Sequence, residues 1–450
     1  IGWAWTALIL YYIVLTPFSD SAGYSITATV RLIEAYLVYV MFVTIASERT
    51  VVLFTKGLLF VGVVATLASF VFLLVPSWAN FLPPMNLLSA IYGHNHLADL
   101  LLFMFPIAIA QQSWLLVTLF TVGMIFTYAR GAWFLLIGYL LFLAWRSKSV
   151  VARRVGLLVA SATVAAFLLI SLGLTPIQKP SLIADGRWEY WRQAIEAIKE
   201  RPFFGSGPGT FYLESKRLQA RPSSYSWFAH SFPFEVIVET GIVGLLILTL
   251  LLSVVLSYTI KKIITQKHNN VPATPLFWGA ALMFMYGLYE FNLDYAVIWL
   301  FVWAILGVLG KNDDRMTGRS QNSKFMSITA LAVVALFYLM SMSSVASSVY
   351  AQNSAWSFLL APFHAEQTKK YLKLLEFSHW ERLRWLRETV LFFHQRDPLV
   401  RLELAILEEK EQDLFNAQGD YRLVAYGDPK NFEARFAYIK LMIMELFMKN

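Results

Sequence analysis

The chain consists mainly of long apolar runs separated by short polar segments. A helix needs about 20 apolar residues to cross a hydrocarbon core of roughly 30 Å, and many of the runs approach that length. The pattern predicts an all-α, polytopic membrane protein of about eleven or twelve transmembrane helices. We place spans at residues 1–17, 25–47, 52–76, 89–111, 113–129, 131–145, 154–174, 234–260, 274–291, 293–310 and 325–347.

The apolar stretch at residues 113–145 is too long for one crossing, because as a single helix it would extend about 50 Å. We therefore predict a hairpin that turns near Tyr128-Ala129-Arg130-Gly131. Short loops at 146–154, 261–267 and 311–324 are rich in Lys and Arg, which is typical of cytoplasmic loops. This topology puts Arg130 and the loop 175–233 on the extracytoplasmic side of the cytoplasmic (inner) membrane.

We expect four parts in the chain: N-terminal transmembrane helices at 1–174, an extracytoplasmic loop with active-site elements at 175–233, C-terminal transmembrane helices at 234–349, and an extracytoplasmic tail at 350–450. Because Ile1 is not a natural start, we expect the natural protein to extend beyond it.

Composition supports a membrane protein, with 58% hydrophobic and only 15% charged residues. The absence of cysteine excludes disulfides, thiolate nucleophiles and zinc-thiolate sites. The net charge of +8 suits an anionic membrane surface, and no nucleic-acid-binding motif occurs.

The loop 175–233 carries eight Lys or Arg against five Asp or Glu, an excess that suggests an anionic ligand. The alternative is that these charges form a solvated helix face. Residues 187–199 have the spacing of an amphipathic helix at the membrane interface, where Arg187 is either a ligand-binding group or an anchor that reaches the headgroups.

Residues 201–211 are rich in turns, and their glycines permit close approach of the backbone. The segment lacks the Gly-Lys-Ser/Thr ending of a phosphate-binding loop, so it does not predict nucleotide binding.

His230 precedes the span at 234–260, and an imidazole there can act as a general base near neutral pH. The plainer alternative is a helix cap or an interfacial residue. Glu235 and Glu239 lie one helical turn apart near the membrane boundary, where ionisable groups are costly unless paired or functional. They are candidates to orient His230 or to pair an arginine.

These motifs together resemble the O-antigen ligase and Wzy-type polymerase superfamily over residues 85–310. The residues that carry the resemblance, in chain order, are Gly93-His94-Asn95-His96-Leu97-Ala98, Tyr128-Ala129-Arg130-Gly131-Ala132, Gly186-Arg187-Trp188-Glu189-Tyr190-Trp191, Pro202-Phe203-Phe204-Gly205-Ser206-Gly207-Pro208-Gly209, Ala229-His230-Ser231 and Glu239-Thr240-Gly241-Ile242-Val243-Gly244.

The resemblance implies a membrane glycosyltransferase with a GT-C type of helical body that needs no cofactor and no metal. It would move a glycan, with inversion, from an undecaprenyl-diphosphate carrier to a hydroxyl of a glycan, lipid or protein acceptor. His230 would be the general base, and Arg130 and Arg187 would bind the diphosphate. Guanidinium groups suit this role because they stay charged and grip phosphate oxygens bidentately. Arg192, Glu235, Glu239, His94 and His96 are candidate supporting residues.

Two other readings of polar clusters stay open. His94 and His96, with Asp99 and His230, contain enough nitrogen and oxygen ligands for a metal, although residues i and i+2 on a helix point apart. We favour a role in lining the site or in hydrogen bonding within the bundle. Glu290, Asn292 and Asp294 are either polar loop residues, which we favour, or contacts to the acceptor.

The tail loses the long apolar runs, and residues 351–450 hold fourteen basic and fourteen acidic residues. Asp397-Pro398 and Asp428-Pro429 begin similar segments 31 residues apart, close to the 34-residue tetratricopeptide (TPR) period. We predict a soluble, TPR-like helical tail that offers a surface to an acceptor or a protein partner.

Within the superfamily we favour an O-antigen ligase with a lipid A-core acceptor, ahead of a polymerase or a protein O-oligosaccharyltransferase. The alternative to a glycosyltransferase is a transporter or flippase of lipid-linked glycans. That hypothesis predicts buried ionisable residues and broken helices near the bilayer midplane. A noncatalytic scaffold is the third possibility, and it predicts that His230 is dispensable.

Overall fold

The computed structural model describes most of the chain and divides it into two compact units. Unit 1 comprises Ile1–Leu37, Gly186–Leu256 and Ile328–Asn450, and unit 2 comprises Val38–Asp185 and Ser257–Ser327. The described residues are 1–45, 48–74, 94–127, 129–146, 150, 153–154, 157–158, 160–161, 164–165, 186–265, 273–294, 296–310, 328, 331, 363–374 and 380–448. These residues form helices and turns and no strand, so the all-α prediction is confirmed.

Helices occur where the described part of the chain was predicted to span the membrane. They are α1 (Gly2–Leu15), the 3₁₀ helix η1 (Thr16–Phe18), α2 (Ala22–Ile45), α3 (Glu48–Leu74), α4 (His94–Ala110), α5 (Trp114–Thr127), α6 (Arg130–Arg146), α10 (Phe232–Thr265), α11 (Ala273–Gly287), η5 (Asn292–Asp294) and α12 (Ala296–Leu309). Segments of α2, α3 and α10 are long and apolar enough to cross a membrane, and several other helices are apolar but shorter. The chain is therefore an integral membrane protein. The predicted spans at 154–174 and 325–347 lie almost entirely outside the described residues, and the span count stays a prediction.

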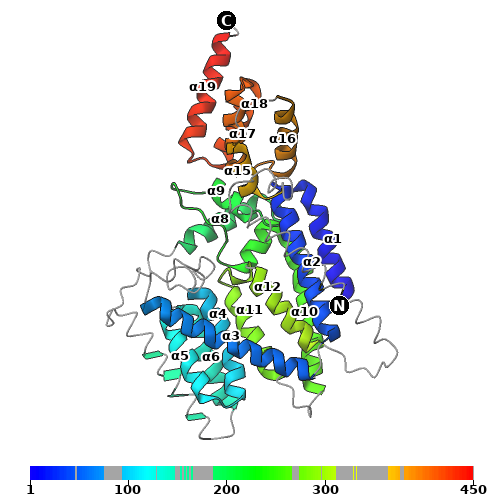
Figure 1. Cartoon of the computed structure of the whole chain (residues 1–450), viewed down its shortest axis with the longest axis vertical. Helices are drawn as coiled ribbons and strands as arrows, with labels where there is room; N and C mark the ends of the chain where they lie inside the picture. Colours follow the sequence, from blue (N-terminus) through cyan, green and yellow to red (C-terminus); the bar gives the residue numbers. More distant parts are fainter. Residues whose placement is uncertain are drawn as a thin grey trace. The chain divides into compact units, whose positions relative to one another are not determined.

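Unit 2 is a helical bundle in which α4 packs against α3, α5, α6 and α11 (Figure 1). The predicted hairpin at 113–145 is confirmed, because α5 ends at Thr127 and α6 begins at Arg130. Two hydrogen bonds close this turn: Ala129 N donates to Thr127 Oγ1 at 3.3 Å, and Trp133 Nε1 donates to the Met124 carbonyl at 2.7 Å.

In unit 1, the membrane helix α10 is interrupted at Gly241, which has φ 66° and ψ −176°. The span predicted at 234–260 is thus not one regular helix. Glycine adopts this backbone conformation without strain, whereas a residue with a side chain would be strained in it. An interruption leaves N–H and C=O groups without helical partners, and in a membrane these groups must find partners within the protein.

Residues 202–210, which we name the glycine loop, supply those partners. Ile242 N and Val243 N donate to the carbonyls of Pro202 and Phe203, and Ser206 N and Gly207 N donate to the carbonyls of Val238 and Glu239, at 2.8–3.4 Å. The loop adopts this path because Gly205, Gly207 and Gly209 all have positive φ. The predicted close approach of the backbone is therefore confirmed, and here it serves the fold.

The glycine loop joins two short helices, α8 (Arg187–Glu200) and α9 (Phe211–Arg217). The predicted helix at 187–199 is thus confirmed. Ala194, Ala197, Phe211, Ala229 and Val238 form a small buried core that holds α8, α9 and the start of α10 together.

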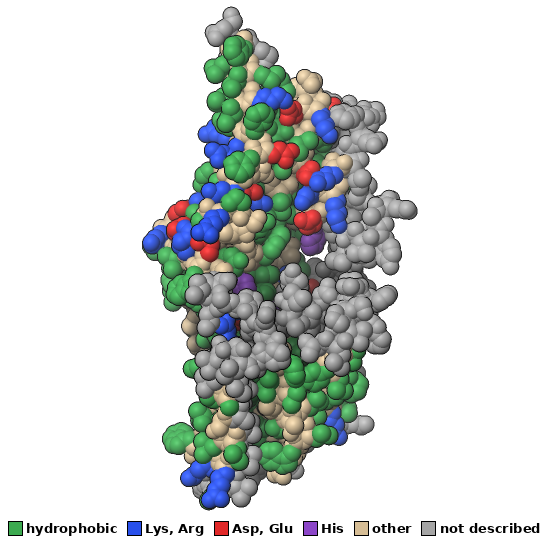
Figure 2. Space-filling view, turned by 90° about the vertical axis from the view of Figure 1, so that its left-hand side faces the viewer, with side chains coloured by type: hydrophobic (Ala, Val, Ile, Leu, Met, Phe, Trp, Pro, Cys, Tyr) green, Lys and Arg blue, Asp and Glu red, His purple; other side chains and the backbone are tan. Residues whose placement is uncertain are grey.

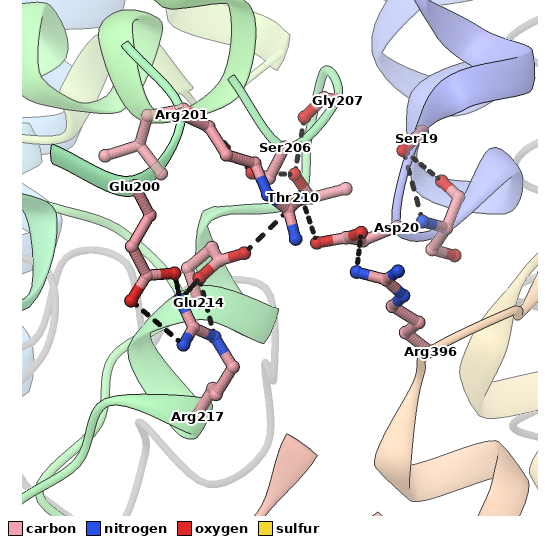
Figure 3. A network of polar contacts seen from close by, with 12 residues as sticks. Ser19, Asp20, Glu200, Arg201, Ser206, Gly207, Thr210, Glu214, Arg217 and Arg396 are labelled. Atoms are coloured by element: carbon pink, nitrogen blue, oxygen red, sulfur yellow. Dashed lines mark hydrogen bonds and ion pairs between the residues drawn. The ribbon is translucent and has the colours of Figure 1, made fainter. Parts of the chain in front are cut away.

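An ionic network surrounds this part of unit 1 (Figure 3). Asp20, in the turn before α2, accepts hydrogen bonds from Arg201 Nη1 at 2.7 Å and Arg396 Nη1 at 2.9 Å. Arg217 binds both Glu214 and Glu200. Burial raises the pKa of Glu214, and the adjacent Arg217 opposes that shift. The network therefore joins the N-terminal turn, α9 and the C-terminal tail.

The tail consists of helices, as predicted: α15 (Ala365–Leu374), α16 (Trp380–Phe393), α17 (Pro398–Lys410), α18 (Leu414–Gly427) and α19 (Phe432–Met448). The last three pack in sequence order, each against the next (Figure 1). Charged side chains of both signs are interspersed on its surface (Figure 2). Asp397 caps α17 directly, whereas α19 begins only at Phe432, so the two similar segments differ in register and the TPR-like assignment stays a prediction.

We expect Gly241→Ala to destabilise the protein. A Cβ there would clash with the carbonyl carbon of Phe203, and the backbone conformation adds roughly 1–3 kcal/mol of strain for any residue other than glycine. The thermal unfolding midpoint in detergent should fall by several degrees. Gly138→Ala is the matched control, because Gly138 lies in α6 with no atom within 4 Å of the new Cβ, and it should leave the midpoint unchanged or raise it. Equal midpoints for the two variants would contradict the role of Gly241.

A second prediction concerns Glu408 in α17, which is buried and accepts a hydrogen bond from Arg387 Nε at 2.8 Å. Burial and the neighbouring Asp420 raise the pKa of Glu408 from 4.5 to about 8. Between those values the folded tail binds a proton that the unfolded chain releases, so its stability falls as pH rises. Hydrogen exchange on the full chain should show α17 and α18 less protected at about pH 9 than at about pH 6. Glu408→Gln should remove most of this difference, and protection in the wild type that is unchanged or rises would refute the assignment.

Candidate functional site

His230 lies in unit 1, in the segment that enters α10. Its φ of 52° is left-handed, an uncommon conformation for a residue with a side chain. The preceding residue helps to fix it there. Ala229 is fully buried, and its N–H donates to Glu235 Oε2 at 2.8 Å. Strained backbone held by its surroundings is frequent at functional sites, so this geometry supports a functional role for His230.

The ring of His230 stacks on Tyr190 of α8, with ring centroids 5.5 Å apart and planes inclined by 19°. Arg187 precedes Tyr190 by three residues, so the two side chains lie on neighbouring positions of one helix face. Tyr190 itself lies across the start of α8, because a Cβ at Gly186 would be 2.9 Å from the Tyr190 hydroxyl oxygen. Arg187 and the residue on which His230 stacks thus occupy neighbouring positions of α8, and both Arg187 and His230 are half-buried.

The two candidate glutamates have different surroundings. Glu235 binds the backbone next to His230 and so positions that segment. Glu239 accepts hydrogen bonds from Gly209 N at 2.8 Å and Phe211 N at 3.2 Å. Its carboxylate therefore holds the glycine loop against α10 and compensates the N-terminus of α9.

Arg192 is bound by carboxylates of its own helix, since Nη2 lies 2.6 Å from Glu189 and Nη1 lies 2.6 Å from Glu196. Nη2 also donates to the Leu218 carbonyl at 2.9 Å. The hydrogen bond from Arg192 lowers the pKa of Glu189. These contacts give Arg192 a structural role at the α8 surface.

Arg130 belongs to unit 2, where it is the first residue of α6 and is half-buried. The next residue, Gly131, is required for packing: a Cβ there would lie 1.4 Å from the Tyr289 hydroxyl oxygen. Tyr289 also contacts Tyr286, with ring centroids 5.4 Å apart. The Arg130-Gly131 turn is thus covered by the segment that follows α11.

That segment holds the three residues for which a polar-loop role was favoured. Glu290, Asn292 and Asp294 do lie between α11 and α12, but Glu290 and Asn292 are buried, as is Asp99 of α4. Asn292 Nδ2 donates to the Asn95 carbonyl at 3.4 Å, and the Tyr286 hydroxyl donates to Asn95 Oδ1 at 3.2 Å. The sequence missed this cluster because its residues come from helices far apart in the chain.

His96 is buried and packs edge-on against Phe291, with ring centroids 5.5 Å apart. The side chain of His94 lies outside the described residues. Among the described residues, no group of three or more His, Asp or Glu side chains is arranged to hold a metal ion. His96 therefore has the surroundings of a residue within the bundle.

Comparisons with known proteins find a family match in the part of the chain that contains most of the candidate site. Residues 115–249 match the family described as O-antigen ligase. A segment of 115 residues is 29% identical to the exopolysaccharide production protein ExoQ of Rhizobium meliloti (strain 1021). That alignment covers 24% of this chain and 26% of that protein, so the chain spans about a quarter of the relative's length. No solved structure matches the chain.

The matched segment contains Arg130, Arg187, His230 and the whole glycine loop. The resemblance to the O-antigen ligase and Wzy-type polymerase superfamily, drawn from the motifs, is thereby confirmed for this segment of the chain.

Proposed function

We propose that this protein is a metal-independent, inverting glycosyltransferase that moves a glycan from an undecaprenyl-diphosphate carrier to an acceptor hydroxyl. The observation that carries the proposal is the stack of His230 on Tyr190, one helical turn from Arg187, inside the family segment. The first candidate acceptor is lipid A-core, as for an O-antigen ligase. The active site and the tail would face the extracytoplasmic side of the inner membrane.

In this mechanism the imidazole of His230 takes the proton from the acceptor hydroxyl as its oxygen attacks the anomeric carbon. The bond between that carbon and the diphosphate oxygen breaks on the opposite face, so the configuration inverts. Arg187, together with Arg130, would bind the diphosphate and stabilise the charge that develops as it leaves. Tyr190 and Glu235 would act as positioning residues for His230.

A polymerase of the same superfamily is the second candidate. The observation that favours it is the relative, whose printed name assigns it to exopolysaccharide production. A polymerase would use the same donor and the same base, and its acceptor would be a second lipid-linked glycan. Transfer to a protein hydroxyl, as by a protein O-oligosaccharyltransferase, would differ again only in the acceptor.

The transporter alternative predicts broken helices and buried charges near the bilayer midplane. The break at Gly241 lies in the first third of α10, and Asp99 lies in the second turn of α4. Glu290 follows the end of α11. Asp99 and Glu290 thus lie near helix ends, and neither Asp99 nor Gly241 lies at the centre of its helix, so together these features give more support to a transferase with a site at one membrane face.

We expect His230→Ala to lower glycan transfer by about 10²- to 10⁴-fold, the usual contribution of a positioned general base. The measurement is release of undecaprenyl diphosphate from a glycan-charged carrier by purified protein, with chelator present and with candidate acceptors supplied. His364→Ala is the control, because His364 is another half-buried histidine of unit 1. A His230 variant as active as the wild type would refute base catalysis, and loss of activity on chelation would refute the metal-independent mechanism.

We expect Arg187→Ala to lower kcat/KM for the lipid-linked donor by about one to two orders of magnitude, since a guanidinium-phosphate contact contributes roughly 1.5–3 kcal/mol. Arg187→Lys should restore only part of this loss, because an ammonium group cannot bind two phosphate oxygens in the same way. Arg422→Ala, at an exposed position of α18, is the matched control. Full activity of Arg187→Ala would remove this residue from the diphosphate site.

A further inference from the structure

An aromatic stack lies on the chain just before His230. The rings of Trp227 and Tyr212 are nearly parallel, inclined by 10°, with centroids 3.9 Å apart. Tyr225 meets Tyr212 edge-on at 5.7 Å. Tyr212 is buried, whereas Trp227 is 47% exposed. One face of the indole is therefore covered by Tyr212, and much of the remaining ring surface is accessible.

Polar contacts with α9 and with the tail support the stack. Lys216 Nζ lies 5.7 Å from the Tyr212 ring centroid and 5.2 Å from that of Tyr225, and it pairs with Asp428 of the tail at 3.2 Å. Ser226 N donates to Ser215 Oγ at 2.9 Å, which ties the segment to α9 immediately before Trp227. The stack and this hydrogen bond restrain Trp227 before any ligand arrives, which reduces the entropy lost on binding.

The surroundings of Trp227 suit a sugar more than a lipid chain. The preceding residues Arg221-Pro222-Ser223-Ser224-Tyr225-Ser226 are mostly polar and include five hydroxyl or guanidinium groups. A pyranose ring has one face of C–H bonds, whose partial positive charge is attracted to the face of an aromatic ring, while its hydroxyls need polar partners at the rim. A membrane anchor would need apolar neighbours instead.

The stack is also close to the proposed base. His230 follows Trp227 by three positions, so their Cα atoms lie within about 11 Å, the reach of a fully extended chain of that length. That distance is on the scale of one or two sugar rings. A glycan residue on Trp227 would therefore lie within a short distance of the reacting centre.

We propose that Trp227, supported by Tyr212, is a carbohydrate-binding platform that stacks against a pyranose ring of the glycan beside the His230 centre. This inference rests on the proposed function for its biological substrate, but glycan binding itself can be measured without transfer.

The test uses the full chain in detergent and a reducing oligosaccharide released by mild acid from the surface polysaccharide of the source cells. Saturation-transfer NMR should detect binding to the wild type, and Trp227→Ala should weaken it about tenfold. Trp227→Tyr should keep a part of the affinity, because it retains an aromatic face. Trp385→Ala is the matched control, since Trp385 is a tail tryptophan with a similar exposure of 50%. Thermal unfolding midpoints verify that each variant is folded.

Absence of binding to the wild type, or equal affinity of wild type and Trp227→Ala, would overturn the platform. Unchanged binding with a transfer defect seen only in lipid vesicles would assign Trp227 to the membrane and would also overturn it. Trp227-dependent binding in a protein that transfers no glycan would support the platform while refuting the proposed function. If transfer requires His230 but glycan binding is the same with and without Trp227, the proposed function is supported and the platform is refuted.

Discussion

The fold around the candidate site depends on how a broken membrane helix satisfies its backbone. At Gly241 the hydrogen-bond ladder of α10 is interrupted, and the glycine loop supplies both donors and acceptors to the groups that the break leaves without helical partners. In a membrane this exchange is obligatory, because an unpaired peptide group in hydrocarbon costs several kcal/mol. The glycine loop is therefore a structural part of the α10 helix, although residues 211–231 separate the two in sequence.

The geometry of the site follows from that pairing. The glycine loop begins directly after α8 and ends where α9 begins, so its attachment to α10 fixes both helices. Tyr190 comes from α8, and Glu235 comes from the start of α10. His230 is held between these two residues, one through its ring and the other through the preceding peptide group. A substitution at the α10 break should thus shift the position of the imidazole through both Tyr190 and Glu235, although it changes neither residue.

Much of the fold was predictable because its signals are local. The apolar runs predicted the membrane helices, the length of 113–145 predicted the hairpin, and the amphipathic spacing of residues 187–199 predicted α8. The break at Gly241 was missed because the apolar pattern continues through it and only the distant glycine loop makes it favourable. The stacks of Tyr190 on His230 and of Tyr212 on Trp227 were missed for the same reason. Each joins a helix to a loop distant in sequence, and periodicity carries no information on such pairs.

The role of charge also changes once the contacts are known. The excess of basic residues at 175–233 suggested an anionic ligand, yet several of these cations have carboxylate partners. Arg192, Arg201, Lys216 and Arg217 pair with Glu189, Asp20, Asp428 and Glu214 respectively. A net count thus overstates the positive potential available to a substrate. The case for a diphosphate depends instead on the position of Arg187, one turn before the residue on which His230 stacks. A single guanidinium at the reacting centre can stabilise a leaving group, whereas a diffuse surplus of charge cannot.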